Sequence, residues 1–78
     1  MKKEELIKNL QQTGFIKIKQ YSDYETWQGN PVFGIYGEDL NFIEIDIYSD
    51  HYEVEYFAAS EDSEEFYSSF PLANCKFE

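Results

Sequence analysis

One stretch of alternating residues, NFIEIDIYSDHYEVEYFA at positions 41–58, constrains the fold more than any other part of the chain. Apolar and acidic side chains take turns on both sides of Ser49-Asp50, and a period of two is typical of half-buried strands. The stretch therefore predicts an antiparallel hairpin that turns at these two residues. One face of this hairpin is apolar and is predicted to lie against the core; it consists of Ile43, Ile45, Ile47, Tyr52, Val54 and Tyr56.

Four carboxylates fall on the opposite face of the predicted hairpin, with Asp46 facing Glu53 and Glu44 facing Glu55. A longer turn would change the partners but not the face, because parity decides which side a strand residue occupies. Unit charges about 5 Å apart repel by roughly 1 kcal/mol in water and roughly 3 kcal/mol near a protein surface. Two interpretations follow: a solvated face on an acidic protein, or an exposed surface kept for a cationic partner.

The N-terminal segment has the pattern of an amphipathic helix. Leu6, Ile7 and Leu10 recur at helical spacing, and Gly14 is well suited to close a helix in the left-handed conformation. We expect a helix over residues 3–12 that lays its apolar stripe on a sheet.

Two further strands are predicted between this helix and the hairpin. Residues 15–21 alternate, which places Ile16 and Ile18 on one face and both lysines of the segment on the other. Residues 22–31 are rich in turn formers and predict a loop, with a short strand around the tryptophan as an alternative. Residues 32–37 predict another strand.

The segment after the hairpin predicts a second, acidic helix. Asp62 and Glu65 have the spacing of a capping box, Phe66 and Phe70 share a helical face, and Pro71 would end the helix. A short edge strand over the alternating segment LANCKF completes the prediction. The expected fold class is thus α+β, in one domain over residues 1–78, with an N-terminal helix, a four-stranded antiparallel meander, a short acidic helix and a C-terminal edge strand.

Charge is distributed unevenly along the chain, whose formal net charge is -10. Residues 1–20 contain five lysines and two glutamates, whereas residues 21–75 contain thirteen acidic residues and no basic one. The absence of arginine argues against direct binding of nucleic acid, which requires clustered cations. No apolar run approaches the length of a membrane span, and the N-terminus does not resemble a secretion signal, so we expect a cytoplasmic protein without membrane contact.

The residues that carry most enzyme chemistry are scarce in this chain. His51 is the only histidine, predicted as a turn residue, and Cys75 the only cysteine, predicted as a small buried residue. No phosphate-binding loop, nucleophile elbow or zinc-site spacing occurs, so we expect a non-catalytic protein without a cofactor. A weak divalent-cation site is an alternative, because oxygen ligands abound, although the EF-hand spacing is absent.

The carboxylate spacing suggests what such a face would imitate. Same-face residues on a strand lie about 7 Å apart, on the order of the spacing between successive phosphates of a nucleic-acid strand. A carboxylate array can therefore occupy a groove lined with Arg and Lys, and electrostatic attraction speeds such association. Tyr48, Phe42 and Phe57 fall on the same side, where they would anchor an interface or, for the two phenylalanines, form a second small core.

A short Lys/Glu helix, a small antiparallel sheet and the acidic segment EDSEEFY, in an arginine-free chain, resemble the DNA-mimicking inhibitors of phages and mobile elements, including anti-CRISPR proteins that block a Cas nuclease. The resemblance implies an inhibitor that occupies the nucleic-acid groove of a basic nuclease in a bacterial host. An immunity or antitoxin protein against a basic toxin is the alternative with the same surface. The residues predicted to contact the partner are Glu44, Asp46, Tyr48, Asp50, Glu53, Glu55, Glu61, Asp62, Glu64 and Glu65.

Overall fold

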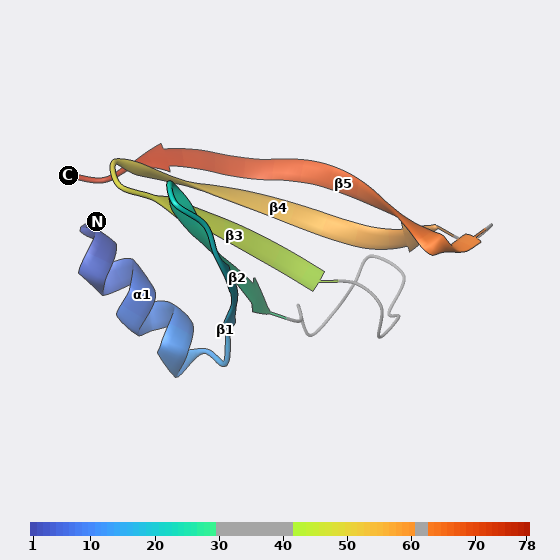
Figure 1. Ribbon diagram of the computed structural model, residues 1–78, viewed down its shortest axis with the longest axis horizontal. Helices are drawn as coiled ribbons and strands as arrows, with labels where there is room; N and C mark the ends of the chain where they lie inside the picture. The colour runs from blue at the N-terminus through green and yellow to red at the C-terminus, as the bar shows by residue number, and fades with distance from the viewer. Residues whose placement is uncertain (30–41, 61–62) are drawn as a thin grey trace.

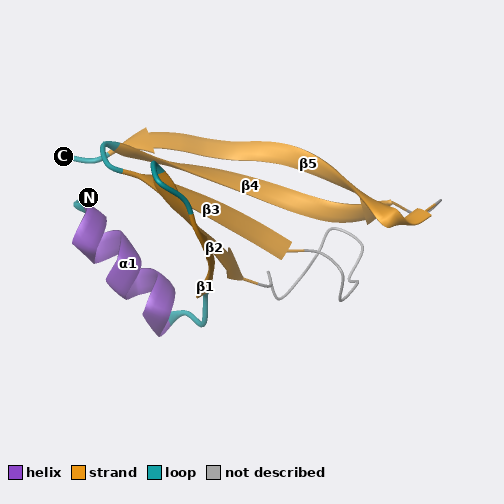
Figure 2. Cartoon of the chain, in the orientation of Figure 1, coloured by secondary structure: helices purple, strands orange, loops and turns teal. Residues whose placement is uncertain are grey.

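The structure is a computed structural model that describes residues 1–29, 42–60 and 63–78, the side chains of residues 58–60 and 63–68 excepted. Within these residues one helix precedes five strands, which form an antiparallel sheet in chain order (Figure 1). The helix lies beside one end of the sheet, and the hairpin of the last two strands extends well past it (Figure 2). The elements are α1 (Lys3–Gln12), β1 (Ile16–Gln20), β2 (Tyr24–Gly29), β3 (Phe42–Tyr48), β4 (His51–Ser60) and β5 (Ser63–Lys76).

Helix α1 has the bounds that the sequence predicts, and the predicted glycine follows its C-cap residue, Thr13. Gly14 has a φ of 86°, a conformation that glycine adopts without strain because it has no side chain. The N–H of Phe15 donates to the Leu10 carbonyl oxygen (2.9 Å) and that of Gly14 to the Gln11 carbonyl oxygen (3.5 Å). This pair of bonds is the Schellman arrangement, which satisfies carbonyls at the end of the helix.

The core lies between α1 and one face of the sheet. Leu6 and Leu10 of the helix are buried with Trp27 of β2 and with Ile45 and Ile47 of β3, the last only 1% exposed. Half-buried apolar side chains surround this cluster: Ile7, Phe15, Ile43, Tyr52, Val54 and Phe77. The predicted apolar face of the hairpin therefore does pack against the helix, with Ile43 and Val54 only half-buried; Tyr56, also predicted there, is buried outside this cluster.

The hairpin of β3 and β4 has the predicted register. Ile47 pairs with Tyr52, Asp46 with Glu53, and Glu44 with Glu55, so the chain turns at Ser49 and Asp50. Residues 49–50 are the only two between the strands, and the alternation of apolar and acidic residues leaves no other register that buries the apolar set.

The prediction of a second helix is wrong, because residues 63–76 form the long strand β5 along the open edge of β4. A helix cap is worth only about 1 kcal/mol, whereas β4 offers ten residues of unpaired backbone for a ladder. Pro71 does not prevent this pairing, since proline is tolerated in an edge strand whose missing N–H would face solvent. The sheet therefore has five strands rather than four, and the predicted C-terminal edge strand is the end of β5.

The segment around Trp27 is also different from the predicted loop, since Tyr24–Gly29 form strand β2, the alternative that the sequence left open. In β1 the register shifts between Lys17, which pairs with Trp27, and Lys19, which pairs with Thr26. One extra residue at Ile18 thus puts the two lysines on opposite faces, contrary to prediction. The strand predicted over residues 32–37 lies outside the described residues.

Candidate functional site: a carboxylate-lined sheet face

Four carboxylates lie together on the sheet face that is turned away from α1, and we call this surface the acidic face. It consists of two rows across β3 and β4: Asp46 with Glu53, and Glu44 with Glu55. All four side chains are half-buried, whereas the sequence predicts an exposed face. The reason is that strands on both sides, β2 and β5, bring neighbours against them.

The row of Asp46 and Glu53 is held by neutral hydrogen-bond donors. The hydroxyl of Thr26 donates to Asp46 Oδ1 (2.7 Å), and Asn74 Nδ2 donates to Glu53 Oε1 (3.3 Å). The phenol of Tyr48 also donates to Glu53. Burial, then the charge of Glu53 and this hydrogen bond, raise the pKa of Tyr48 to about 12. These donors come from β2, β3 and β5, so the row is fixed by strands on both sides of the hairpin.

The row of Glu44 and Glu55 has no such support. Within the described chain, neither carboxylate makes a hydrogen bond or an ion pair. Burial raises the pKa of the Glu44 carboxyl, and the charges of Asp46 and Glu55 raise it further, while Lys19 opposes them. The repulsion that the sequence predicts for opposed acids is therefore concentrated in this row.

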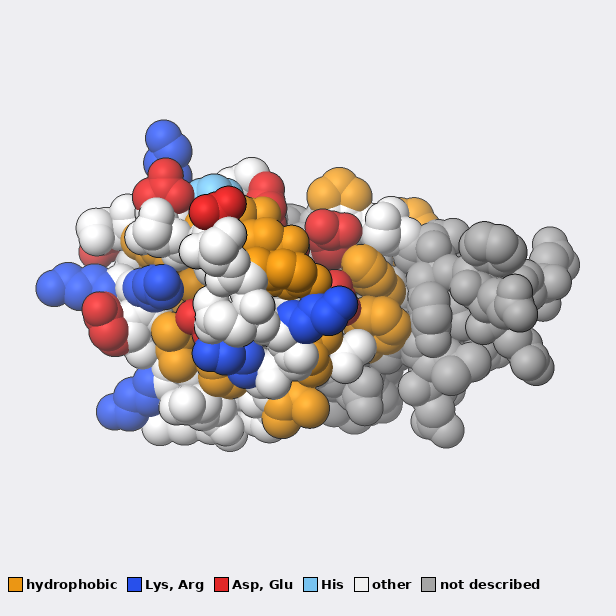
Figure 3. Space-filling model, in the orientation of Figure 1, with side chains coloured by type: hydrophobic (Ala, Val, Ile, Leu, Met, Phe, Trp, Pro, Cys, Tyr) orange, Lys and Arg blue, Asp and Glu red, His pale blue; other side chains and the backbone are white. Residues whose placement is uncertain are grey.

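The lysines of β1 neutralise little of the negative charge of the acidic face. Lys17 lies on the helix side, where its Nζ is 3.5 Å from Glu25 Oε2; the same carboxylate oxygen accepts a hydrogen bond from Trp27 Nε1 (2.9 Å). Lys19 lies on the acidic side and acts on Glu44 through its charge, yet its Nζ sits 5.7 Å from the centre of the Tyr21 ring. In the view of Figure 3, lysines gather mainly around the helical end of the molecule.

Stacked aromatic rings border the acidic face at both ends. At one end Tyr21 stacks on Tyr24, Tyr24 on Tyr48 and Tyr48 on His51, with ring centres 4.6, 4.8 and 4.3 Å apart. At the other end, Phe42 and Phe57 stack with ring centres 4.9 Å apart. Stacked aromatic pairs of this kind stabilise a fold beyond the area that they bury.

Of the remaining residues predicted to contact a partner, only Asp50 has a side chain within the described part of the structure. Asp50 is exposed in the turn and accepts a hydrogen bond from His51 Nδ1 (2.7 Å), which lowers the pKa of Asp50. His51 itself begins β4 rather than lying in the turn. Glu64 and Glu65 belong to β5, but their side chains, like the whole of Glu61 and Asp62, lie outside the described residues.

Sequence reasoning missed the side chains that support the face. Thr26 lies opposite Asp46 and Asn74 opposite Glu53 in the sheet, and no local pattern of the sequence reveals these pairings. Cys75, predicted as buried, is half-buried and hydrogen-bonds Tyr52, which raises the pKa of that tyrosine.

No three His, Cys, Asp or Glu side chains converge on a common point suited to a metal ion in the part of the chain that the structure describes. No helix among the described residues is long and apolar enough to cross a membrane. Comparison with known proteins gave no match: no family model, no curated protein and no solved structure is significantly similar to the chain.

Proposed function

We propose that the protein is a non-catalytic inhibitor that binds a basic nucleic-acid-binding protein, such as a CRISPR effector nuclease or another defence nuclease of a bacterial host. The acidic face is the contact surface and takes the place of nucleic acid in the partner's groove. The observation that carries the proposal is the stacking of four carboxylates on one sheet face, with no lysine Nζ within 4.0 Å of any of them in the described chain.

The arrangement of the face supports this function over simple solubility. Opposed carboxylates cost stability, and a net charge of magnitude about 2 to 8 would already keep a small domain soluble. The two rows are about 7 Å apart along the strands, on the order of the phosphate spacing that a basic groove is built to receive. Aromatic rings at both ends supply the apolar anchors that protein interfaces use.

The test is a competition experiment on a purified CRISPR effector nuclease, in which the protein displaces a labelled nucleic acid at several salt concentrations. The face variant is Glu44→Gln/Glu55→Gln. The matched control is Glu4→Gln/Glu5→Gln, which changes the net charge equally but on the exposed surface of α1. We expect the face variant to associate roughly tenfold more slowly, with a flatter salt dependence, and the control to match the wild type.

Equal weakening in the face variant and the control would show that only overall charge matters, and the acidic face would not be the contact surface. Displacement that does not weaken as salt rises would contradict the electrostatic basis of the proposal. If the protein displaces nothing from this nuclease, basic nucleases of other defence systems and nuclease toxins are tested with the same pair of variants.

A further inference from the structure

A bulge in β5 opens a hollow next to the acidic face. Val54 pairs with Ala73, but the next residue of β4, Glu55, pairs with Pro71, so Leu72 is an extra residue in the edge strand. Such a bulge bends the strand and re-aims a side chain. The resulting hollow measures about 300 Å³, at the lower end of the range of about 300 to 1,000 Å³ for ligand pockets.

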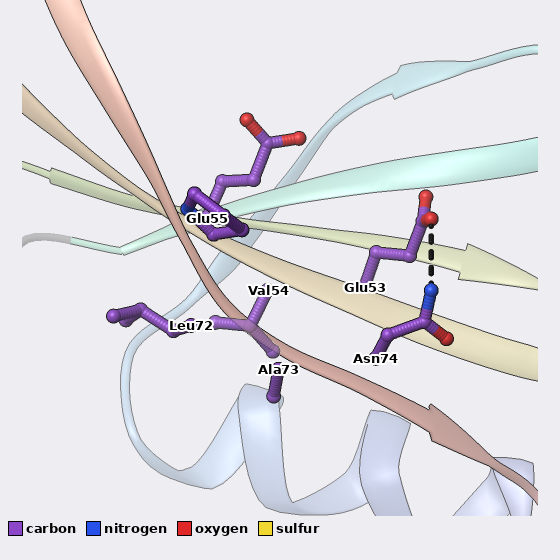
Figure 4. A pocket seen from close by; sticks show the side chains of 7 residues that line it. Glu53, Val54, Glu55, Leu72, Ala73 and Asn74 are labelled. Atoms are coloured by element: carbon purple, nitrogen blue, oxygen red, sulfur yellow. Dashed lines mark hydrogen bonds between the residues drawn. The ribbon is translucent and has the colours of Figure 1, made fainter.

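The lining of the hollow combines a carboxylate wall with an apolar one. Glu53 and Glu55 rise from β4 on the side away from the helix, whereas Leu72 projects sideways from β5 (Figure 4). Leu72 is 57% exposed, and the exposed Pro71 lies beside it, so the two form an apolar wall open to solvent. Asn74 holds the Glu53 carboxylate in place through the hydrogen bond to its Oε1 (3.3 Å).

No cation of the described chain fills this hollow. Lys17 pairs with Glu25 on the helix side, and Lys19 belongs to β1, three strands away from β4 in the sheet. Lys76, two residues beyond Asn74, acts through its charge on Asp50 in the turn. Glu55 accordingly makes no hydrogen bond or ion pair with any described residue.

We propose that the hollow beside Leu72 receives one arginine side chain of the partner, an inference that rests on the proposed function and names the chemistry of its contact. The guanidinium bonds to the carboxylates of Glu55 and Glu53, and the aliphatic stem covers Leu72 and Pro71. Arginine fits better than lysine because its planar, weakly hydrated head pairs with carboxylates in a fork and tolerates an apolar wall, whereas an ammonium keeps its water.

The probe is N-acetyl-arginine amide, titrated into the ¹⁵N-labelled protein and followed by amide chemical shifts. Matched titrations use the citrulline analogue, which has the same shape without the charge, and the lysine analogue. We expect saturable shifts confined to residues 53–55 and 72–74 with the arginine probe, weaker ones with the lysine probe and none with citrulline. Equal responses to the arginine and lysine probes, or shifts spread evenly over the acidic face, would overturn the assignment.

Single substitutions test the contributions of the carboxylate wall and of the apolar wall separately. Glu55→Gln is expected to lower the affinity for the arginine probe about two- to fivefold, which is the effect of losing one ion pair open to solvent. Leu72→Ser, at a largely exposed position, should lower the same affinity about twofold, because it removes the apolar contact with the aliphatic stem of the probe. Glu4→Gln, on the exposed surface of α1 and outside the acidic face, serves as the control and should change little. Unchanged binding in Leu72→Ser, with a well-dispersed spectrum that proves folding, would also overturn the assignment.

The outcome of these titrations is independent of the competition experiment on the nuclease. A protein that inhibits the nuclease but shows no localised shifts retains the proposed function and loses the arginine site. A protein that binds the arginine probe in the hollow but displaces no nucleic acid from any basic nuclease retains the site and loses the function.

Discussion

Replacing Glu44 by glutamine should make the protein more stable at neutral pH. Glu44 faces Glu55 across the strands, and charges about 5 Å apart repel by roughly 1 kcal/mol in water and roughly 3 kcal/mol at the dielectric of a protein surface. No hydrogen bond or ion pair to a described residue is lost by the change. Because water still reaches this half-buried pair, we expect a gain near the lower of these values, about 1 kcal/mol.

The pH dependence of this gain is a sharper test than its size. The pKa of the Glu44 carboxyl lies above its ordinary value of 4.5 in the folded protein, mainly through burial and then through the charges of Asp46 and Glu55. The folded state therefore binds this proton more tightly than the unfolded state does. The stability contributed by Glu44 is fully present below about pH 4.5 and is lost as the pH rises through the folded pKa. Glutamine does not titrate, so the advantage of the variant should vanish in acid and reach its full value at neutral pH.

Urea unfolding at low salt, followed by tryptophan fluorescence, measures this difference between pH 4 and pH 7.5. Trp27 is the only tryptophan and is 6% exposed in the core, so its emission reports global unfolding. In thermal unfolding the same gain would raise Tm by about 4 to 8 °C for a domain of this size. Asp46→Asn is the matched control: it also removes one charge but weakens the bond from Thr26, so it should gain less. A Glu44→Gln variant that is less stable at neutral pH, or whose gain persists unchanged in acid, would refute the reasoning.

Three further substitutions test other parts of the structure. Ile47→Ala should lower the free energy of unfolding by about 2 to 5 kcal/mol in the same urea assay, because Ile47 is 1% exposed and its removal leaves a cavity; a loss below 1 kcal/mol would contradict the core described above. Ultraviolet titration should show one tyrosine ionising at a pKa of about 12, and Tyr48→Phe should abolish that transition, since burial and Glu53 hold the phenol neutral. Gly14→Ala should destabilise the protein by about 1 kcal/mol, because its φ of 86° strains any side chain, whereas Gln12→Ala, two residues earlier on the exposed helix surface, should not.

The parts of the fold that follow from local pattern were predictable, and those that depend on distant pairing were not. Helix α1 and the hairpin of β3 and β4 each carry their own period and their own turn or cap residue, which is sufficient to fix their bounds and register. Residues 63–76 carry signals for both helix and strand. The open edge of β4 decides between them, and an edge created by tertiary structure leaves no mark in a local window.

In the candidate site, too, the features set by local pattern were predictable and those set by distant pairing were not. Parity alone places Glu44, Asp46, Glu53 and Glu55 on one face, and the register confirms it. The donors that support one row but not the other come from β2, β3 and β5, and the pairing of the outer two strands with the hairpin leaves no mark in a local window. A bulge at Ile18 also decides which lysine faces the acids, so the sequence could not say how much of the charge is neutralised.

The identity of the supporting groups bears on why the carboxylates are there at all. A fold that needed only to accommodate four acids would best place lysines opposite them, since an ion pair satisfies the oxygens and cancels the charge. The groups found next to Asp46 and Glu53 are instead a hydroxyl, an amide and a phenol, which satisfy the oxygens and leave the negative potential intact. The lysine that could neutralise the neighbouring row acts on Glu44 only at a distance and lies near the Tyr21 ring. Neutral donors that fix the geometry of a carboxylate without removing its charge are what a surface requires when its electrostatic field must reach a second molecule, and this is the strongest physical reason to regard the acidic face as a binding surface.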